Sequence, residues 1–201
     1  MGYSISWVAI SGEEPERALE KLGLARTGEF EEVAESYLTS PTLPSPWLLI
    51  RINRFDAPFI SWRVLASLSV NWSVTACQVE EHVMFSSASS YANGSLVWRV
   101  KHDAQQGIKH LSSTGSTPPQ LGEIHDRLMD KQDAAGGINA RVDYIFDVPV
   151  ALAQSITSYR HDSRSWSESE KPYEVLRQEY GTTHEAKPRI RQKGGGWRRA
   201  Q

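Results

Sequence analysis

The dipeptide His-Asp occurs three times in this chain, at residues 102–103, 125–126 and 161–162. Histidine and carboxylate side chains bind divalent metals and act as general acids and bases, so the three copies raise the possibility of a metal site or a hydrolase. Metal ligands must converge to within about 2.0–2.2 Å of one ion. The elements that carry the three pairs therefore decide whether they can form one site.

The first pair lies at the end of a predicted β-hairpin. Asn93-Gly94 favours a two-residue type I′ turn, which places Leu96 opposite Tyr91 and Val100 opposite Ser87. Because paired residues share a face and the faces alternate, one face would carry His102 and the other face His82. The first face would also hold Val83, Phe85, Tyr91, Leu96, Trp98 and Val100, and the second face Asp103. His82 and His102 are therefore not expected to bind one metal.

The second and third pairs belong to two predicted helices. His125 and Asp126 lie beside or outside the apolar stripe of a helix over residues 119–135, formed by Leu121, Ile124, Leu128 and Met129. His161 follows a helix over residues 148–160, where the helix dipole favours positive charge. One strand and two helices do not predict a shared metal centre, and we expect neither a metal nor a cofactor.

A hydrolase-type enzyme is the alternative hypothesis. Its candidate residues would be His82, His102 and His161, together with Glu80, Glu81 or Asp162. Ser87 is a diagonal neighbour of His102 in the predicted hairpin, but no Gly-x-Ser-x-Gly motif provides the sharp turn of a nucleophile. No phosphate-binding glycine loop and no Cys-x-x-Cys or His-Glu-x-x-His motif occurs either. Because the sequence contains no complete set of catalytic residues, it favours a non-enzymatic protein-binding or regulatory module.

Charge is distributed unevenly along the chain. Residues 13–35 contain eight Glu against Arg17, Lys21 and Arg26, which predicts a surface for a protein partner, as would an exposed sheet edge. The C-terminal segment is basic and could contact nucleic-acid phosphates and stack on a base. It is short and interrupted by glycines, so a solubilising tail is the preferred interpretation and nucleic-acid binding is not expected. Its residues are Lys187, Arg189, Arg191, Lys193, Trp197, Arg198 and Arg199.

The 201 residues, 39% of them hydrophobic, suffice for one core. We predict one α+β domain over residues 1–165, followed by a mobile linker and basic tail over 166–201. A mostly antiparallel sheet would be built around a meander at 70–113, with strands at 3–10, 24–31 and 47–53 and a loop at 36–46. Helices at 12–22, 57–67, 119–135 and 148–160 would pack on one face of the sheet.

The compartment is predicted from what the sequence lacks. Cys77 is the single cysteine, which excludes an intramolecular disulfide, and no apolar run approaches the roughly 18 residues of a membrane span. The first ten residues contain neither the basic region nor the long apolar core of a secretory signal. These features predict a cytoplasmic protein that does not bind membranes.

Several segments together resemble a bacterial family of uncharacterised intracellular proteins. They are MGYSISWVAI, LGLARTGE, VEEHVMFSSAS, NGSLVWRVKHD, DYIFDVPVALA and YRHD, and the likeness extends from Met1 to about Leu176. The resemblance implies an intracellular α+β protein and no particular activity. The extension after Leu176 departs from the pattern.

Overall fold

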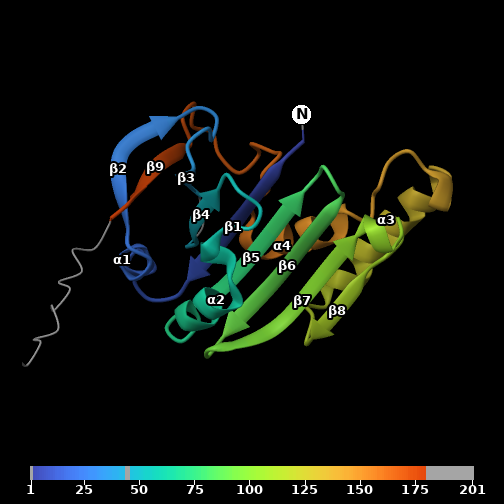
Figure 1. The fold of residues 1–201 in the computed structure, drawn as a ribbon, viewed down its shortest axis with the longest axis horizontal. Helices are drawn as coiled ribbons and strands as arrows, with labels where there is room; N and C mark the ends of the chain where they lie inside the picture. The colour runs from blue at the N-terminus through green and yellow to red at the C-terminus, as the bar shows by residue number, and fades with distance from the viewer. Residues whose placement is uncertain (1, 44–45, 180–201) are drawn as a thin grey trace, which may run out of the picture.

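The computed structural model describes residues 2–43 and 46–179, and within them nine strands form one antiparallel sheet (Figure 1). The strand order is β2-β9-β3-β4-β1-β5-β6-β7-β8, so β2 and β8 are the edges. The strands are β1 Ser4–Ser11, β2 Leu24–Glu31, β3 Leu38–Pro41, β4 Leu48–Ile52, β5 Ser73–Glu80, β6 Phe85–Ala92, β7 Ser95–Asp103, β8 Ser112–Gly115 and β9 Tyr173–Gln178. The α-helices are α1 Arg17–Lys21, α2 Trp62–Leu68, α3 Gln120–Ala134 and α4 Asp147–Thr157.

The α+β class and the antiparallel meander of β5 to β8 are confirmed, but the helices cover both faces of the sheet instead of one. Trp7 and Ala9 pack on the face covered by α3 and α4, whereas Val8 and Ile10 pack on the face covered by α1 and α2. In Figure 1, α2 lies in front of the sheet and α4 behind it. Strand β1 is buried on both sides, so its nearly continuous apolar sequence does not show which helix covers which face.

The Asn93-Gly94 turn is confirmed, because both residues have positive φ, and Tyr91 pairs with Leu96 as predicted. Beyond that pair the register shifts by one residue at Val97, so Trp98 faces Ser90 and His102 faces Ser86. An extra residue in one strand reverses the facing of all later side chains relative to the partner strand. The prediction that Tyr91 shares a face with Trp98 was therefore wrong, as was the placing of Ser87 beside His102.

Two segments predicted to be irregular contribute strands. Strand β3 lies within residues 36–46, and β9 lies within the segment from residue 166 that we expected to be a mobile linker. Strand β9 pairs with β2 on one side and β3 on the other, and Trp166 before it is buried. The boundary at residue 165 is thus too early. Residues 187–199 of the basic tail lie outside the described residues.

Three predicted helices differ at their ends from those observed. The helix predicted from residue 12 begins later, because Ser11 ends β1 and α1 begins only at Arg17. The helix predicted over residues 57–67 is divided, because a separate 3-10 turn over Pro58–Ile60 precedes α2. Arg160 lies beyond the end of α4 and binds Asp147 at its start and Asp162.

Within the described parts of the chain, none of the helices combines the length and the apolar character that crossing a membrane requires.

Candidate functional site

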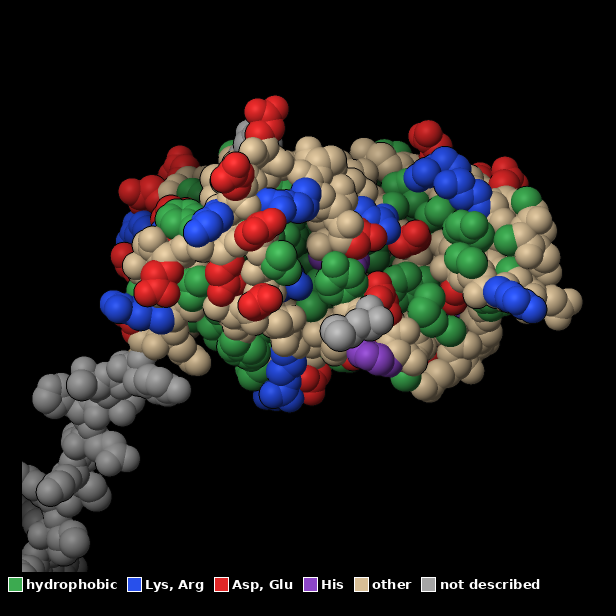
Figure 2. Space-filling view, turned by 90° about the horizontal axis from the view of Figure 1, so that it is seen from above, with side chains coloured by type: hydrophobic (Ala, Val, Ile, Leu, Met, Phe, Trp, Pro, Cys, Tyr) green, Lys and Arg blue, Asp and Glu red, His purple; other side chains and the backbone are tan. Residues whose placement is uncertain are grey.

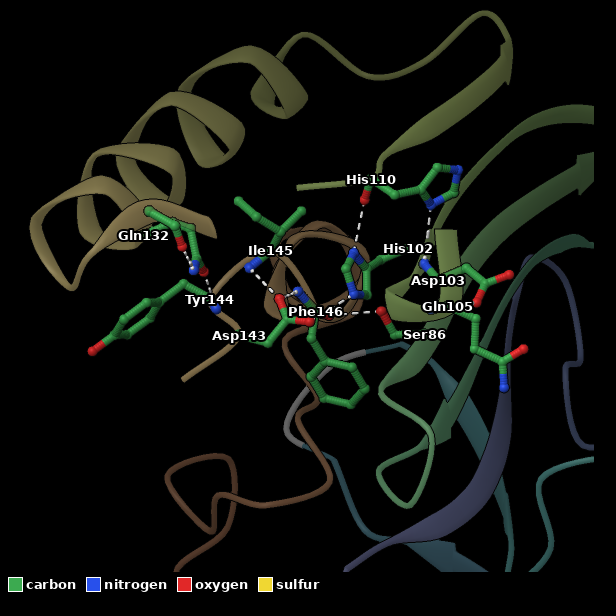
Figure 3. A network of polar contacts seen from close by, with 11 residues as sticks. Ser86, His102, Asp103, Gln105, His110, Gln132, Asp143, Tyr144, Ile145 and Phe146 are labelled. Atoms are coloured by element: carbon green, nitrogen blue, oxygen red, sulfur yellow. Dashed lines mark hydrogen bonds and ion pairs between the residues drawn. The ribbon is translucent and has the colours of Figure 1, made fainter. Parts of the chain in front are cut away.

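His102 is a fully buried histidine at the end of β7, with both ring nitrogens engaged (Figure 3). Its Nδ1 lies 2.7 Å from the His110 carbonyl oxygen, and its Nε2 lies 2.9 Å from Asp143 Oδ2. A carbonyl oxygen only accepts, so Nδ1 carries a proton and donates it, while Nε2 and the carboxyl group share a second proton. The His102 ring consequently has no nitrogen left to bind a metal or to act as a base.

The surroundings of His102 position the loop between α3 and α4. Asp143 Oδ1 accepts the backbone N–H groups of Ile145 and Phe146, each at 3.1 Å. Buried Gln132 donates to the Gly137 carbonyl and accepts the Tyr144 N–H, at 2.8 Å each. These contacts connect β7, α3 and the start of α4 (Figure 3). The network therefore fixes a loop to the core, which is a structural role.

Ser86, His102 and Asp143 have the residue types of a catalytic triad, but their contacts are different. The Ser86 hydroxyl donates to the Phe146 carbonyl oxygen at 2.6 Å, although Ser86 lies opposite His102 in the sheet. A triad requires the serine hydroxyl to donate to the histidine base. The Ser86 hydroxyl and the His102 Nδ1–H group both donate to carbonyl oxygens instead. The arrangement therefore does not activate a nucleophile.

His82, Glu80 and Glu81 lie at the turn between β5 and β6. The His82 side chain is exposed and its Nδ1 lies 2.6 Å from Glu80 Oε1. Burial alone would raise the pKa of Glu80, but hydrogen bonds from Ser4 and His82 outweigh it and lower the pKa. Glu81 Oε2 accepts the Tyr3 N–H at 2.8 Å. The two glutamates therefore attach the turn to the beginning of β1.

His161 has a third and different environment. It is 6% exposed, neither ring nitrogen has a hydrogen-bond partner in the described structure, and its ring meets Tyr3 edge-on at 5.0 Å. Burial lowers the pKa of His161 to about 4. The neighbouring Asp162 pairs with Arg160. Burial would raise the pKa of Asp162, but the hydrogen bonds from Arg160 outweigh burial and lower this pKa. Asp162 is thus committed to the arginine.

The candidate histidines are consequently dispersed over three environments. His102 contacts Asp143, His82 contacts Glu80 and His161 contacts Tyr3. His125 interacts with its neighbour Asp126 at 3.3 Å on the surface of α3. In the part of the chain that the structure describes, no three His, Cys, Asp or Glu side chains are grouped as ligands of one metal ion.

A polar row that the sequence analysis missed crosses the sheet beneath aromatic residues. Arg51 of β4 pairs with Trp7 of β1 on one side and Thr39 of β3 on the other, so the three side chains share a face. Tyr159 packs edge-on against Trp7 at 5.5 Å. The signal in the sequence was the single charge in the apolar strand LLIRI. An arginine near the end of a strand is usually exposed to solvent, so this charge did not indicate a buried site.

Comparisons with protein-family models, with curated proteins and with solved structures found no match to this chain. The resemblance to a bacterial family of intracellular proteins therefore stays a hypothesis. Any functional statement depends on the geometry of the described residues.

Proposed function

We propose that this protein is a non-enzymatic protein-binding or regulatory module that recognises its partner at the edge strand β2. The observation that carries this proposal is that β2 lies within the Glu-rich segment and, in the described sheet, pairs on one side only, with β9. An outer strand presents unpaired backbone N–H and C=O groups to which another chain can add a strand. The two surfaces considered from sequence, the acidic segment and a sheet edge, thus coincide.

The charge at this edge is negative and largely uncompensated. Arg26 bonds to Glu16 and Glu174, Arg17 pairs with Glu14, and Lys21 donates to the Ser67 carbonyl. Four exposed glutamates have no side-chain hydrogen bond or ion pair with any described residue, namely Glu13, Glu20, Glu29 and Glu35. Figure 2 shows acidic side chains, with basic ones between them, over the end of the molecule that carries β2.

Two apolar side chains are exposed among these charges. Phe30 on β2 is 47% exposed, and Val33 just after the strand is 62% exposed. An apolar contact surrounded by charge is typical of a binding surface with a hydrophobic centre and a polar rim. The complementary partner is an extended segment in which basic and apolar residues alternate. Its charges would raise the association rate and fix its register.

The alternative of a hydrolase-type enzyme gains no support from the contacts of its candidate residues. His102 is fully buried and uses both ring nitrogens, and neither ring nitrogen of His161 has a hydrogen-bond partner among the described residues. His82 is accessible, but its partner Glu80 also accepts from Ser4 and attaches the turn to β1. Dispersed groups do not place a base and a nucleophile around one bond.

Binding of model peptides to the full chain tests the proposal. A peptide of alternating Lys and Val should shift the backbone amide NMR signals of residues 24–31, and its affinity should fall as salt rises. A peptide of alternating Glu and Val should not bind. The double substitution Glu29→Lys with Phe30→Ser should weaken the Lys-Val peptide about tenfold or more, which corresponds to about 1.4 kcal/mol.

The matched control is the opposite edge of the same sheet. Strand β8 is also an outer strand with exposed residues, but it carries no glutamate. Thr114→Lys with Ser112→Val on β8 should leave the affinity unchanged. Amide shifts confined to residues 112–115, or equal binding of both peptides, would contradict the proposal.

A further inference from the structure

Arg51 is a buried cation without a buried anion. Its side chain is 5% exposed, and Nη1 donates to the Ala34 carbonyl oxygen at 3.0 Å. Among the described residues no carboxylate lies within ion-pair distance of the guanidinium, and Nε has no hydrogen-bond partner. Arginine stays charged in proteins, and a buried charge is costly unless it is paired.

The neighbours of Arg51 add further unpaired donors. Trp7 Nε1 and Thr39 Oγ1 are both buried without a hydrogen-bond partner in the described structure. Trp7 and Thr39 flank Arg51 in the sheet, and Tyr159 packs on Trp7. Buried polar groups are nearly always hydrogen-bonded, so two unpaired donors around one cation indicate a ligand rich in acceptors.

Two acidic side chains of neighbouring elements bind other arginines. Asp162 pairs with Arg160, and Glu174 bonds to Arg26 on β2. The described part of the chain therefore leaves the Arg51 charge to be neutralised from outside.

We propose that Arg51 binds the carboxylate of a ligand with an apolar or aromatic body, with Trp7 and Thr39 as additional donors. The planar guanidinium matches a carboxylate with two parallel hydrogen bonds, and one negative charge balances one arginine. No lysine and no second unpaired arginine accompanies Arg51 in this row of the described sheet, as a dianionic phosphate would favour. Trp166 and Tyr173, whose rings pack at 5.5 Å, extend the aromatic wall from Tyr159.

The cover over this site is the segment between α4 and β9. Residues 158–172 form neither helix nor strand, so opening the segment breaks no sheet pairing. A groove of about 400 Å³ beside it is lined by Thr42, Leu43, Ser165, Trp166, Ser167 and Glu168. Trp166 lines this groove and also packs on Tyr159. Entry of a ligand from the groove therefore passes the Trp166 ring.

Titration of the full chain with benzoate tests this site, with benzamide as the uncharged counterpart of the same shape. Benzoate should raise the melting temperature and change the fluorescence of Trp7 and Trp166, and benzamide should do neither. Inorganic phosphate at the same ionic strength should act more weakly than benzoate. A peptide ending in Phe with a free carboxylate, compared with its amidated form, separates a protein C-terminus from a small acid as the source of the carboxylate.

Substitution of the cation provides the decisive comparison. Arg51→Met should weaken benzoate about tenfold or more, while Arg99→Met, an exposed arginine on the same sheet, should leave the affinity unchanged. If Arg51→Met does not fold, the Arg51 Nε–H signal in the NMR spectrum of the unmodified chain provides the readout. That signal should shift and exchange more slowly with benzoate. Equal responses to benzoate and benzamide, or an Arg51 signal that no carboxylate moves, would overturn the proposal.

Discussion

Two buried histidines of this protein show how surroundings decide the chemistry of one side chain. His102 has an acceptor against each ring nitrogen, including the Asp143 carboxylate, so a proton is held within the pair. His161 has no hydrogen-bond partner among the described residues and lies against the Tyr3 ring. Burial without an acceptor disfavours the charged ring, so His161 is neutral in the folded chain.

This difference predicts a pH dependence of stability. The unfolded chain takes up a proton at His161 as the pH falls through 6.5, whereas burial holds the pKa of the folded state at about 4. The protonation of His161 therefore does not reduce the free energy of unfolding above pH 6.5. Below that, the free energy of unfolding decreases as the pH falls to about 4. The total loss should be about 3 kcal/mol, at about 1.36 kcal/mol per pKa unit.

Urea unfolding at several pH values between 4.5 and 7 measures this loss. His161→Phe keeps an aromatic ring against Tyr3 and should flatten the decrease of the free energy of unfolding with falling pH. His125→Gln, on the surface of α3, should leave the decrease unchanged. Identical pH profiles for His161→Phe and the unmodified chain would show that His161 does not cause it.

At the level of elements, the extra residue at Val97 determines which side of β7 enters the core. It turns Trp98, Val100 and His102 toward α3 and α4, while Arg99 stays exposed. Strand β8 accommodates the bulge through Gly115, which has φ of 80° and approaches the Val97 carbonyl. A Cβ atom at this glycine would lie 2.1 Å from the Val97 oxygen, so the bulge requires glycine there.

Alanine substitutions at Gly94 and Gly115 distinguish the cost of the close approach to Val97 from the cost of a positive φ angle. Gly94 has φ of 76°, close to that of Gly115, but a Cβ atom there would meet only the Val70 side chain at 3.5 Å. Gly94→Ala should cost about 1 kcal/mol through its positive φ alone. Gly115→Ala should cost about 1–3 kcal/mol more because of the backbone clash.

Denaturant melts measure both changes, and hydrogen exchange locates the second. Gly115→Ala should also reduce the protection of amides at residues 112–115, because separation of β8 relieves the clash. Equal costs for the two substitutions would show that the approach to Val97 is not a constraint.

At the level of the whole molecule, the last described strand completes the sheet between strands that come early in the chain. Among the described strands, β9 is the only partner of β2 and the second partner of β3. Its segment also contributes Trp166, Tyr173 and Leu176 to the two cores. The segment from residue 166, which we expected to be a linker, therefore joins β2 to β3 and the rest of the sheet.

Two truncated chains distinguish the contribution of β9 to stability from that of the basic tail. A chain that ends at Ser165 loses two aromatic core side chains, each worth about 3–5 kcal/mol, and Leu176, worth about 2–5 kcal/mol; this loss is comparable to the 5–15 kcal/mol stability of a typical domain. It should not fold cooperatively. A chain that ends at Ala186 retains every described contact and should keep the melting temperature of the full chain. Thermal unfolding followed by circular dichroism measures both, and a cooperative transition at the same temperature for residues 1–165 would contradict the role of β9.

The sequence by itself determined the features that depend on near neighbours. Alternating apolar residues marked β1, and Asn93-Gly94 marked the turn of the β6–β7 hairpin, because its positive φ angles suit few other residues. The apolar stripe of Ile124 and Leu128 marked α3. The dispersal of the histidines also followed from these elements, since residues on one strand and two helices do not converge unless the fold brings them together.

Only the tertiary structure decided the features that depend on distant partners. Strand β9 becomes a strand because β2 and β3 leave a gap between them, and its own sequence after SESEKP gives no such signal. The bulge at Val97 follows from packing against β8, which the hairpin sequence does not contain. Arg51 became a candidate ligand-binding residue only when Tyr159 and Trp166, more than one hundred residues later, covered it. Sheet pairing and burial are non-local, so their consequences appear only once the chain has folded.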